Sequence, residues 1–510
     1  MTERSEVGKK AALGIAWTVA MGLGTRVLQM VGTLAFTHYV STHDAGEATN
    51  AALVALNAHA FSTFGIPHYL VSRKTTPQEA WQATLILGLS GIIAFAVAIA
   101  LTAPLAVFLK SPEIGLYLPL LAVATFLIRV SQVPERLLQQ ELKFREASRA
   151  RAFGELAYTV FSLAFAVLGA GGMAIVYGNL ARSVISLVAL SVAMPPSVWA
   201  KPQPFDRAIV RRMLAYGLPL GVALFLTFAA RNWDNFIVSA LFGAAVVGAY
   251  GLAYNLADIP ASQIGEQVGD VLTPSFVYLD DEGRKRGLVR ATALLGLIVF
   301  PLAVGLGVTG PTLASTLLGK KWDAVGPMLI ALSTLSVARP VGYTVGSYLQ
   351  ATQRSRVVMW LSVVRLLALL AAVYGLGLLF GPLGACAGVG VAFSLHALAS
   401  IAFVARYDGL PATALLGAAA RPLLACVPLV LAVLGARHGL SSLSVEARFV
   451  RLAVEIVAGG LGYLVGALLF ARGLTRDLLQ LVSNLRKKRG AAKAQVPPPE
   501  PPAIAPGSSA

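Results

Sequence analysis

Apolar runs long enough to cross a lipid bilayer follow one another along most of this chain. A helix needs about 20 residues to cross the hydrocarbon core of a membrane, and about fourteen such runs lie among the 510 residues. A soluble domain of this size would carry more than 13% charged residues. The sequence therefore predicts an all-α, polytopic membrane protein. The expected transmembrane helices cover residues 11–37, 44–69, 82–109, 114–134, 151–169, 172–195, 214–240, 244–276, 288–312, 323–349, 357–380, 382–405, 413–436 and 448–471.

The basic residues indicate how these helices are oriented. With the N-terminus in the cytoplasm, 28 lysines and arginines fall in cytoplasmic segments, 5 fall in outer segments, and 8 arginines lie at membrane depth. Cytoplasmic loops of membrane proteins carry the excess of basic residues. We therefore expect a multi-pass protein with both termini in the cytoplasm. The same distribution accounts for the net charge of +17 without nucleic acid as a partner.

Residues of the same type recur at a nearly constant separation in the two halves of the chain. A fixed offset across several pairs of helices indicates an internal duplication. The matched pairs are Arg26 and Arg231, Pro104 and Pro311, Pro119 and Pro327, Arg129 and Arg339, and Gly178 and Gly388.

The duplication predicts the division of the chain. Residues 1–200 and 201–410 would form two six-helix lobes. Because each copy has an even number of helices, the lobes would be related by a pseudo-two-fold axis along the membrane normal. Residues 411–472 would add two C-terminal helices. Residues 473–510 contain RKKR and PPPEPP and would form a disordered cytoplasmic tail, whose basic cluster could lie against anionic lipid.

Arginines at membrane depth are the first candidate functional residues, because burial of their charge is costly unless they face a wet cavity or a partner. Counting along the helices places Arg26, Arg231, Arg129 and Arg339 near the bilayer centre. If they share a lumen between the lobes, they form a cationic cavity that suits phosphate or carboxylate. Each could instead snorkel or pair with a neighbouring helix. The candidate anion-binding residues are Arg26, Arg231, Arg129, Arg339, Arg365 and Arg182.

The few acids at membrane depth are candidates for an ion-coupling site. Asp234 follows Arg231 by three residues, so an intrahelical ion pair and an ion-coupling site are both open. Glu155 occupies the position that matches Arg365, so the two could face each other, or Glu155 could take up a proton or cation. Asp258 and Glu266 could extend an ion path or could solvate a cavity. The coupling candidates are Asp234, Glu155, Glu266 and Asp258.

Motifs for catalysis or nucleotide binding are absent from the sequence. There is no GxxxxGK(S/T) phosphate loop, no HExxH and no Cys/His metal-binding spacing. The two cysteines, Cys386 and Cys426, lie inside apolar runs and are expected in the core. We therefore expect no catalytic residues, no bound metal and no cofactor, with transport driven by an H⁺ or Na⁺ gradient or by the gradient of the cargo itself.

Several segments resemble the Wzx-type polysaccharide (O-antigen) flippases of the multidrug/oligosaccharidyl-lipid/polysaccharide exporter superfamily. The resemblance covers about residues 8–410, and residues 231–260 are the most specific part. The matching segments are RNWDNFIVSALFGAAVVGAYGLAYNLADIP at 231–260, TPSF at 273–276, LLGKKWDAVGPML at 317–329, RLLQQELKFR at 136–145 and VYGNLAR at 176–182.

This resemblance implies a V-shaped transporter of the bacterial inner membrane. It would move an undecaprenyl-pyrophosphate-linked oligosaccharide to the outer leaflet by alternating access, coupled to H⁺ or Na⁺. Arg26 and Arg231 match arginines that recur in the first and seventh helices of the family. The expected partners are the bilayer, the lipid-linked glycan, and polymerase and chain-length components of polysaccharide synthesis, with the chain itself a monomer.

Three other functions remain open. The first is a cation-coupled multidrug exporter, which the excess of arginine over acid disfavours. The second is a flippase for peptidoglycan precursors, which share the general architecture. The third is a non-transporting protein of the same pathway, such as a polymerase or scaffold, which the duplicated charged core disfavours.

Overall fold

The computed structural model describes residues 24–25, 28–72, 74–442, 447–477 and 480. Within these ranges the chain forms helices and turns and no strand. The predicted all-α class is therefore confirmed. Arg26, the start of the first expected helix and the predicted tail beyond residue 480 lie outside the described residues.

The first half of the chain forms a bundle of short and long helices. Helix α4 begins with a capping box, in which Thr76 and Glu79 bond each other's backbone N–H, and with Pro77 in the first turn. The helices are α2 (Thr42–Ser62), α3 (Ile66–Ser72), α4 (Pro77–Ala100), α5 (Thr102–Phe108), α6 (Ile114–Gln140), α7 (Phe144–Val167), α8 (Met173–Ala193) and the single turn α9 (Pro196–Trp199).

The second half repeats this plan with longer helices. Helices α6 and α14 are both 27 residues long and begin at residues 114 and 325, and the same spacing separates the starts of α7 and α15. The helices are α10 (Arg207–Phe242), α11 (Ala244–Pro260), the π turn η1 (Ala261–Gly265), α12 (Glu266–Val277), α13 (Asp281–Leu317), the 3-10 turn η2 (Lys320–Trp322), α14 (Val325–Ala351), α15 (Ser355–Asp408), α16 (Ala412–Leu424), α17 (Cys426–Ser442) and α18 (Arg448–Phe470).

Ten candidate membrane spans are found among the described residues by length and hydropathy. One of them, in α15, contains two expected helices, joined at Gly381, where the backbone takes a left-handed φ of 68° before Pro382. The expected second and eighth helices correspond to α2 and to α11 with α12, which do not meet the criterion. The chain is a multi-pass membrane protein, and the number fourteen stays a prediction.

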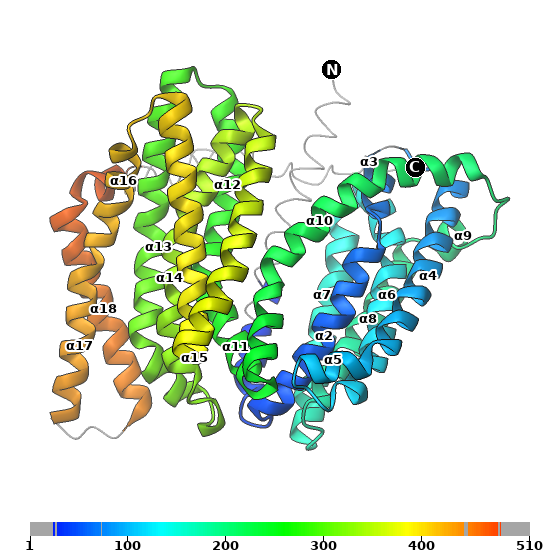
Figure 1. The fold of residues 1–510 in the computed structure, drawn as a ribbon, viewed down its shortest axis with the longest axis horizontal. Coiled ribbons are helices and arrows are strands. Elements are labelled where there is room, and N and C mark those ends of the chain that lie inside the picture. Colours follow the sequence, from blue (N-terminus) through cyan, green and yellow to red (C-terminus); the bar gives the residue numbers. More distant parts are fainter. Residues whose placement is uncertain (1–23, 26–27, 73, 443–446, 478–479, 481–510) are drawn as a thin grey trace, which may run out of the picture.

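The two halves form lobes that approach each other at one end of the molecule and diverge toward the other (Figure 1). Helices α2 and α11 cross at the end where the lobes meet, which we call the narrow end. Helix α10 begins at the opposite, wide end, and so does α13. Helices α16, α17 and α18 pack on α13, on the side of the second lobe away from the first.

Small residues close the narrow end. The backbones of α2 and α11 touch, so that a methyl group on Gly46 would overlap the carbonyl of Ala244, and one on Gly248 would overlap the carbonyl of Thr42. The indole N–H of Trp322, in the second lobe, donates to the carbonyls of Thr37 (2.9 Å) and Val40 (3.2 Å) in the first. At Gly46 and Gly248 backbone lies directly against backbone, so opening this contact requires α2 and α11 to separate.

Helix α10 belongs to both lobes. Its first turns lie in the core of the first lobe, where Ile209 and Met213 pack among residues of α3, α4 and α6. Its last turns pack on α11 and α15, where Val238 belongs to a core cluster made mainly of second-lobe residues together with Val40 and Ala45 of the first lobe. Between these parts, Gly217 and Gly221 flank Pro219 and lie against the backbone that joins α2 to α3. The helix therefore crosses from one lobe to the other as it runs from the wide to the narrow end (Figure 1).

Candidate functional site

Two cavities meet at Arg231 of α10. The first, of about 410 Å³, lies in the wide half of the second lobe, between α10, α12, α14 and α15; we call it the lobe cavity. The second, of about 360 Å³, lies between the lobes in the narrow half and is called the interlobe cavity. Arg231 lines both. It precedes the end of α10 by eleven residues, or about 16 Å, which places it close to the middle of a bilayer of ordinary thickness.

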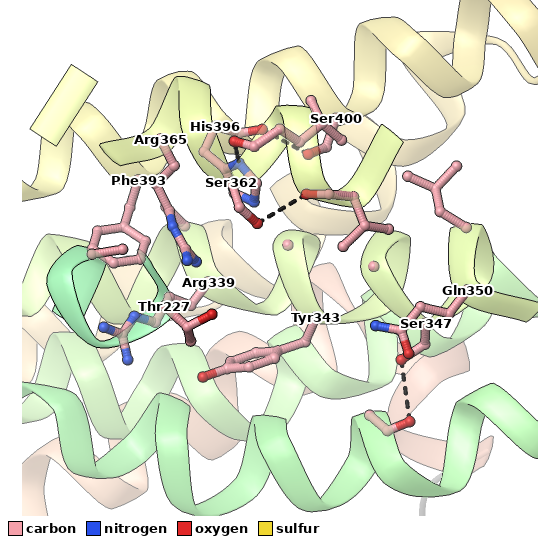
Figure 2. A pocket seen from close by; sticks show the side chains of 18 of the residues that line it. Thr227, Arg339, Tyr343, Ser347, Gln350, Ser362, Arg365, Phe393, His396 and Ser400 are labelled. Carbon is pink, nitrogen blue, oxygen red and sulfur yellow. Dashed lines mark hydrogen bonds between the residues drawn. The ribbon is translucent and has the colours of Figure 1, made fainter. Parts of the chain in front are cut away.

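The lobe cavity is cationic. Its lining includes Arg231, Arg339 and Arg365 and, among the residues that the structure describes, no carboxylate. The guanidinium groups of Arg339 and Arg365 lie 4.5 and 5.6 Å from the centre of the Phe393 ring (Figure 2). An aromatic face attracts cations, so this ring helps to hold both charges in a confined space.

Arg339 is held by groups just behind the cavity wall. It forms an ion pair with Asp258 of α11 and donates to the hydroxyl of Tyr254 at 3.1 Å. The structure thus joins a predicted anion-binding residue to a predicted coupling acid. Among the side chains that the structure describes, one carboxylate stands beside three guanidinium groups, a balance that favours an anionic ligand.

The interlobe cavity is lined mainly by neutral polar and small side chains. Asn232 and Asn235 of α10 and Tyr254 and Asn255 of α11 are among the residues that line it. Trp322 closes it at the narrow end. Amide and hydroxyl groups can both donate and accept hydrogen bonds, which suits hydroxyl-rich ligands such as sugars.

Asp234 is fully buried beside the interlobe cavity rather than in its lining. Its carboxylate accepts hydrogen bonds from the hydroxyl of Tyr250 at 2.6 Å and from the backbone N–H of Asn235 at 3.0 Å. These contacts join α10 to α11 at the level of Arg231. Whether Asp234 takes up a coupling ion stays a prediction.

Glu155 and Arg182 lie together in the first lobe. The side chain of Gln29 donates to the Glu155 carboxylate at 2.5 Å, and Arg182 lies 3.6 Å from its other oxygen. Arg182 also donates to Asn179 at 3.0 Å and lies over the Tyr158 ring. Gln29 and Tyr158 line the interlobe cavity, whereas Glu155 and Arg182 stand behind them. The sequence offered Arg365 as a partner for Glu155; the described contacts of Glu155 are with Gln29 and Arg182.

Arg129 lies away from both cavities. Its guanidinium is buried in the first lobe and donates to the hydroxyls of Ser62 (2.6 Å) and Ser90 (3.3 Å) and to the carbonyls of Ala58 and His59. The last carbonyls of a helix lack intrahelical partners and carry partial negative charge. Arg129 therefore caps the C-terminus of α2, although it occupies the position that matches Arg339 of the second lobe.

Two predicted residues cannot be placed at the site. Arg26 lies outside the described residues, and Glu266 begins α12 with a side chain that is likewise not described.

Sequence reasoning also missed residues that shape the cavities, notably Tyr254, Phe393 and Tyr343. Tyr254 lies one helical turn before Asp258, and this spacing was the only feature of the sequence that could have placed it beside the predicted site.

The sequence pattern of the family described as "Polysaccharide biosynthesis protein" matches residues 40–327. The chain is 24% identical to the lipopolysaccharide biosynthesis protein WzxC of Escherichia coli K12, over 73% of this chain and 75% of that one. It is 25% identical to the succinoglycan biosynthesis transport protein ExoT of Rhizobium meliloti, over 95% and 97%. In fold it matches a solved structure of the lipid II flippase MurJ in an inward closed conformation, with a TM-score of 0.72, 14% identity and coverage of 90% and 99%.

Proposed function

The chain belongs to the family of polysaccharide biosynthesis proteins, and we propose that it flips an undecaprenyl-pyrophosphate-linked oligosaccharide from the cytoplasmic to the outer leaflet of a bacterial inner membrane. It is a transporter and not an enzyme, since it moves its cargo without making or breaking covalent bonds. The names of its relatives, a lipopolysaccharide protein and a succinoglycan transport protein, support a polysaccharide precursor as cargo.

The observation that carries this proposal is the place of Arg231 between two cavities of different character. Three arginines line the lobe cavity, and a guanidinium forks onto phosphate oxygens. Amides and hydroxyls line the interlobe cavity, where sugars would find hydrogen-bond partners. A cargo with a pyrophosphate at one end and sugars at the other matches this pair of cavities.

In this proposal the wide end faces the cytoplasm. The excess of basic residues on that side supports this orientation, with both termini cytoplasmic. The cargo enters between the diverging lobes and leaves once the contact of α2 with α11 opens. An H⁺ or Na⁺ gradient drives the cycle, with Asp234, Asp258, Glu155 and Glu266 as the candidate acids. The chain acts as a monomer beside the polymerase and chain-length components of the pathway.

Reconstitution in liposomes tests the proposal. A fluorescent undecaprenyl-pyrophosphate oligosaccharide should become accessible to a membrane-impermeant quencher on the opposite leaflet. Charge-assisted hydrogen bonds contribute about 1.5–3 kcal/mol, so Arg231→Gln should slow flipping by about 10- to 150-fold. Arg231→Lys should retain part of the rate, and Arg212→Gln, at the exposed start of α10, should retain all of it.

Two outcomes would contradict the proposal. The first is that the wild-type protein does not flip the glycan lipid, and the second is that Arg231→Gln flips it at the wild-type rate. The similarity in fold to MurJ suggests a peptidoglycan-precursor lipid as the alternative cargo. A parallel assay with that lipid distinguishes it from the polysaccharide precursor. A multidrug exporter of cationic compounds would need carboxylates, and the described lining of the lobe cavity holds arginines in their place.

A further inference from the structure

A third cavity lies at the wide end of the second lobe, far from Arg231. It has a volume of about 590 Å³ and runs between the first turns of α13, the turn before α16, and α16 itself; we call it the basic groove. Four cationic side chains line it, three from α13 and one from α16: Lys285, Arg286, Arg290 and Arg421. None of these residues lines either of the cavities assigned to the cargo.

The charges of the groove exceed those that the protein neutralises. Lys285 lies 3.5 Å from Glu282, and Arg290 lies 3.0 Å from Asp477, just after α18. Arg286 and Arg421 form no ion pair with any residue that the structure describes. The groove therefore holds two cations that a ligand could neutralise. The contact of Asp477 with Arg290 shows that an oxyanion fits at its edge.

The floor of the groove is apolar, and so is the surface that leads away from it. Ala293, Leu410 and Ala418 are buried beneath the cationic side chains. Beyond Arg421 along α16, toward the narrow end, Leu423 and Leu424 are 41% and 49% exposed on a helix that belongs to a membrane span. An exposed apolar surface in a membrane span contacts acyl chains. A ligand with an anionic head and apolar tails would fit both parts.

The depth of the cations agrees with the position of lipid headgroups. Arg290 and Arg421 each lie nine residues after the first residue of their helices, and Lys285 and Arg286 lie about one turn nearer the wide end. The apolar stretch of α13 begins directly after Arg290. Basic pockets between transmembrane helices at this level bind the phosphates of anionic lipids.

We propose that the basic groove binds the phosphodiester headgroup of an anionic bilayer phospholipid, with the acyl chains lying along α16. This site is separate from the path of the cargo and does not depend on the function proposed above. A phospholipid held there would fix α16 to α13 and would keep the C-terminal helices in place on the second lobe.

Lipid binding by the purified full chain tests this inference. Native mass spectrometry in a neutral detergent would measure binding of phosphatidylglycerol and of phosphatidylcholine, which we expect to bind much more weakly. Because each cation near a lipid surface contributes about fivefold, Arg286→Gln with Arg421→Gln should weaken phosphatidylglycerol binding by roughly 30-fold. The matched control is Arg207→Gln with Arg212→Gln, two exposed arginines at the same end of α10, which should leave it unchanged.

A variant with the opposite effect guards against misfolding. Asp477→Asn removes the acid that occupies Arg290 and should tighten phosphatidylglycerol binding by about fivefold. Equal losses in the groove and control variants would overturn the inference, because they would show attraction to basic residues in general. Equal binding of the two phospholipids would also overturn the inference. Displacement of the phospholipid by millimolar inorganic phosphate would assign the groove to free phosphate, and displacement by trace isoprenyl pyrophosphate would assign it to the cargo lipid.

Discussion

Replacing Gly46 with alanine should open the narrow end. The added methyl group would lie 3.1 Å from the Cα of Ala244 and closer still to its carbonyl, on a backbone that cannot rotate away. Non-bonded carbon atoms lie about 3.5–4.0 Å apart, so α2 and α11 must separate by on the order of 1 Å. Overpacking of this kind costs about 1–3 kcal/mol. Only the conformation with a closed narrow end bears this cost, so its population relative to open forms should fall by about 5- to 150-fold.

Distance measurements between spin labels would detect the shift. The labels would be attached through cysteines that replace Pro112 and Lys321, which lie in exposed turns of the two lobes beside the narrow end. The native thiols, Cys386 and Cys426, are buried and should not react. In Gly46→Ala the distance distribution should gain a longer component, and flipping should slow because the cycle can no longer return to the closed form efficiently.

Gly88→Ala is the matched control, since Gly88 also lies inside a helix but no atom lies within 4 Å of the position of its added methyl group. This variant shares the gain in helix propensity, about 1 kcal/mol, without the overlap. If Gly46→Ala gave the same distances and the same flipping rate as Gly88→Ala, the contact of α2 with α11 would have to be looser than described. The reasoning on the narrow end would then be wrong.

Three further variants test the charged groups. Arg129→Met should lower the thermal stability in detergent, by about 1–3 kcal/mol for each polar group left without a partner, and should leave the apparent affinity for the cargo unchanged; a selective loss of affinity would contradict its capping role. Glu455→Gln breaks a bidentate ion pair that joins α18 to α17, in which Glu455 is buried and Arg437 is 35% exposed, so unfolding measurements should show a loss of about 1–3 kcal/mol, partly recovered in Glu455→Met with Arg437→Met; a double variant less stable than Glu455→Gln would refute this. Asp258→Asn should free Arg339 to bind phosphate, so calorimetry should show several-fold tighter binding of an isoprenyl pyrophosphate, and unchanged or weaker binding would count against the cationic site.

The fold was largely predictable because the bilayer leaves few solutions. A chain in hydrocarbon must satisfy its backbone within helices, so the lengths of the apolar runs locate the helices. Gly381 before Pro382 also marks the break between two helices that α15 joins. By contrast, α2 contains buried Glu47 and Asn50 and is weakly apolar, and its place in the first lobe depends on partners far along the chain. Glu47 accepts a hydrogen bond from Ser111, and Asn50 donates one to Ser239.

The candidate site was predictable only in part. The burial cost of arginine singled out Arg231, Arg339 and Arg365, which line the lobe cavity, while their role in binding stays a prediction. The same argument cannot tell which way a guanidinium points. Arg129 and Arg339 lie within one residue of the same position in two helices of equal length, yet one caps α2 and the other lies at a cavity. The direction of each guanidinium is set by the neighbouring helices, and it cannot be predicted from the apolar sequence around each arginine.

Helix α10 makes it difficult to divide this protein into two autonomous parts. A cut in the segment 200–206 would follow the predicted boundary between the repeats and would sever only a short connection. The second fragment would nevertheless carry Ile209 and Met213, which complete the core of the first. Each fragment would expose a surface that the other normally covers. Co-expressed halves should therefore reassociate into a working protein, whereas either half alone should be degraded or aggregate.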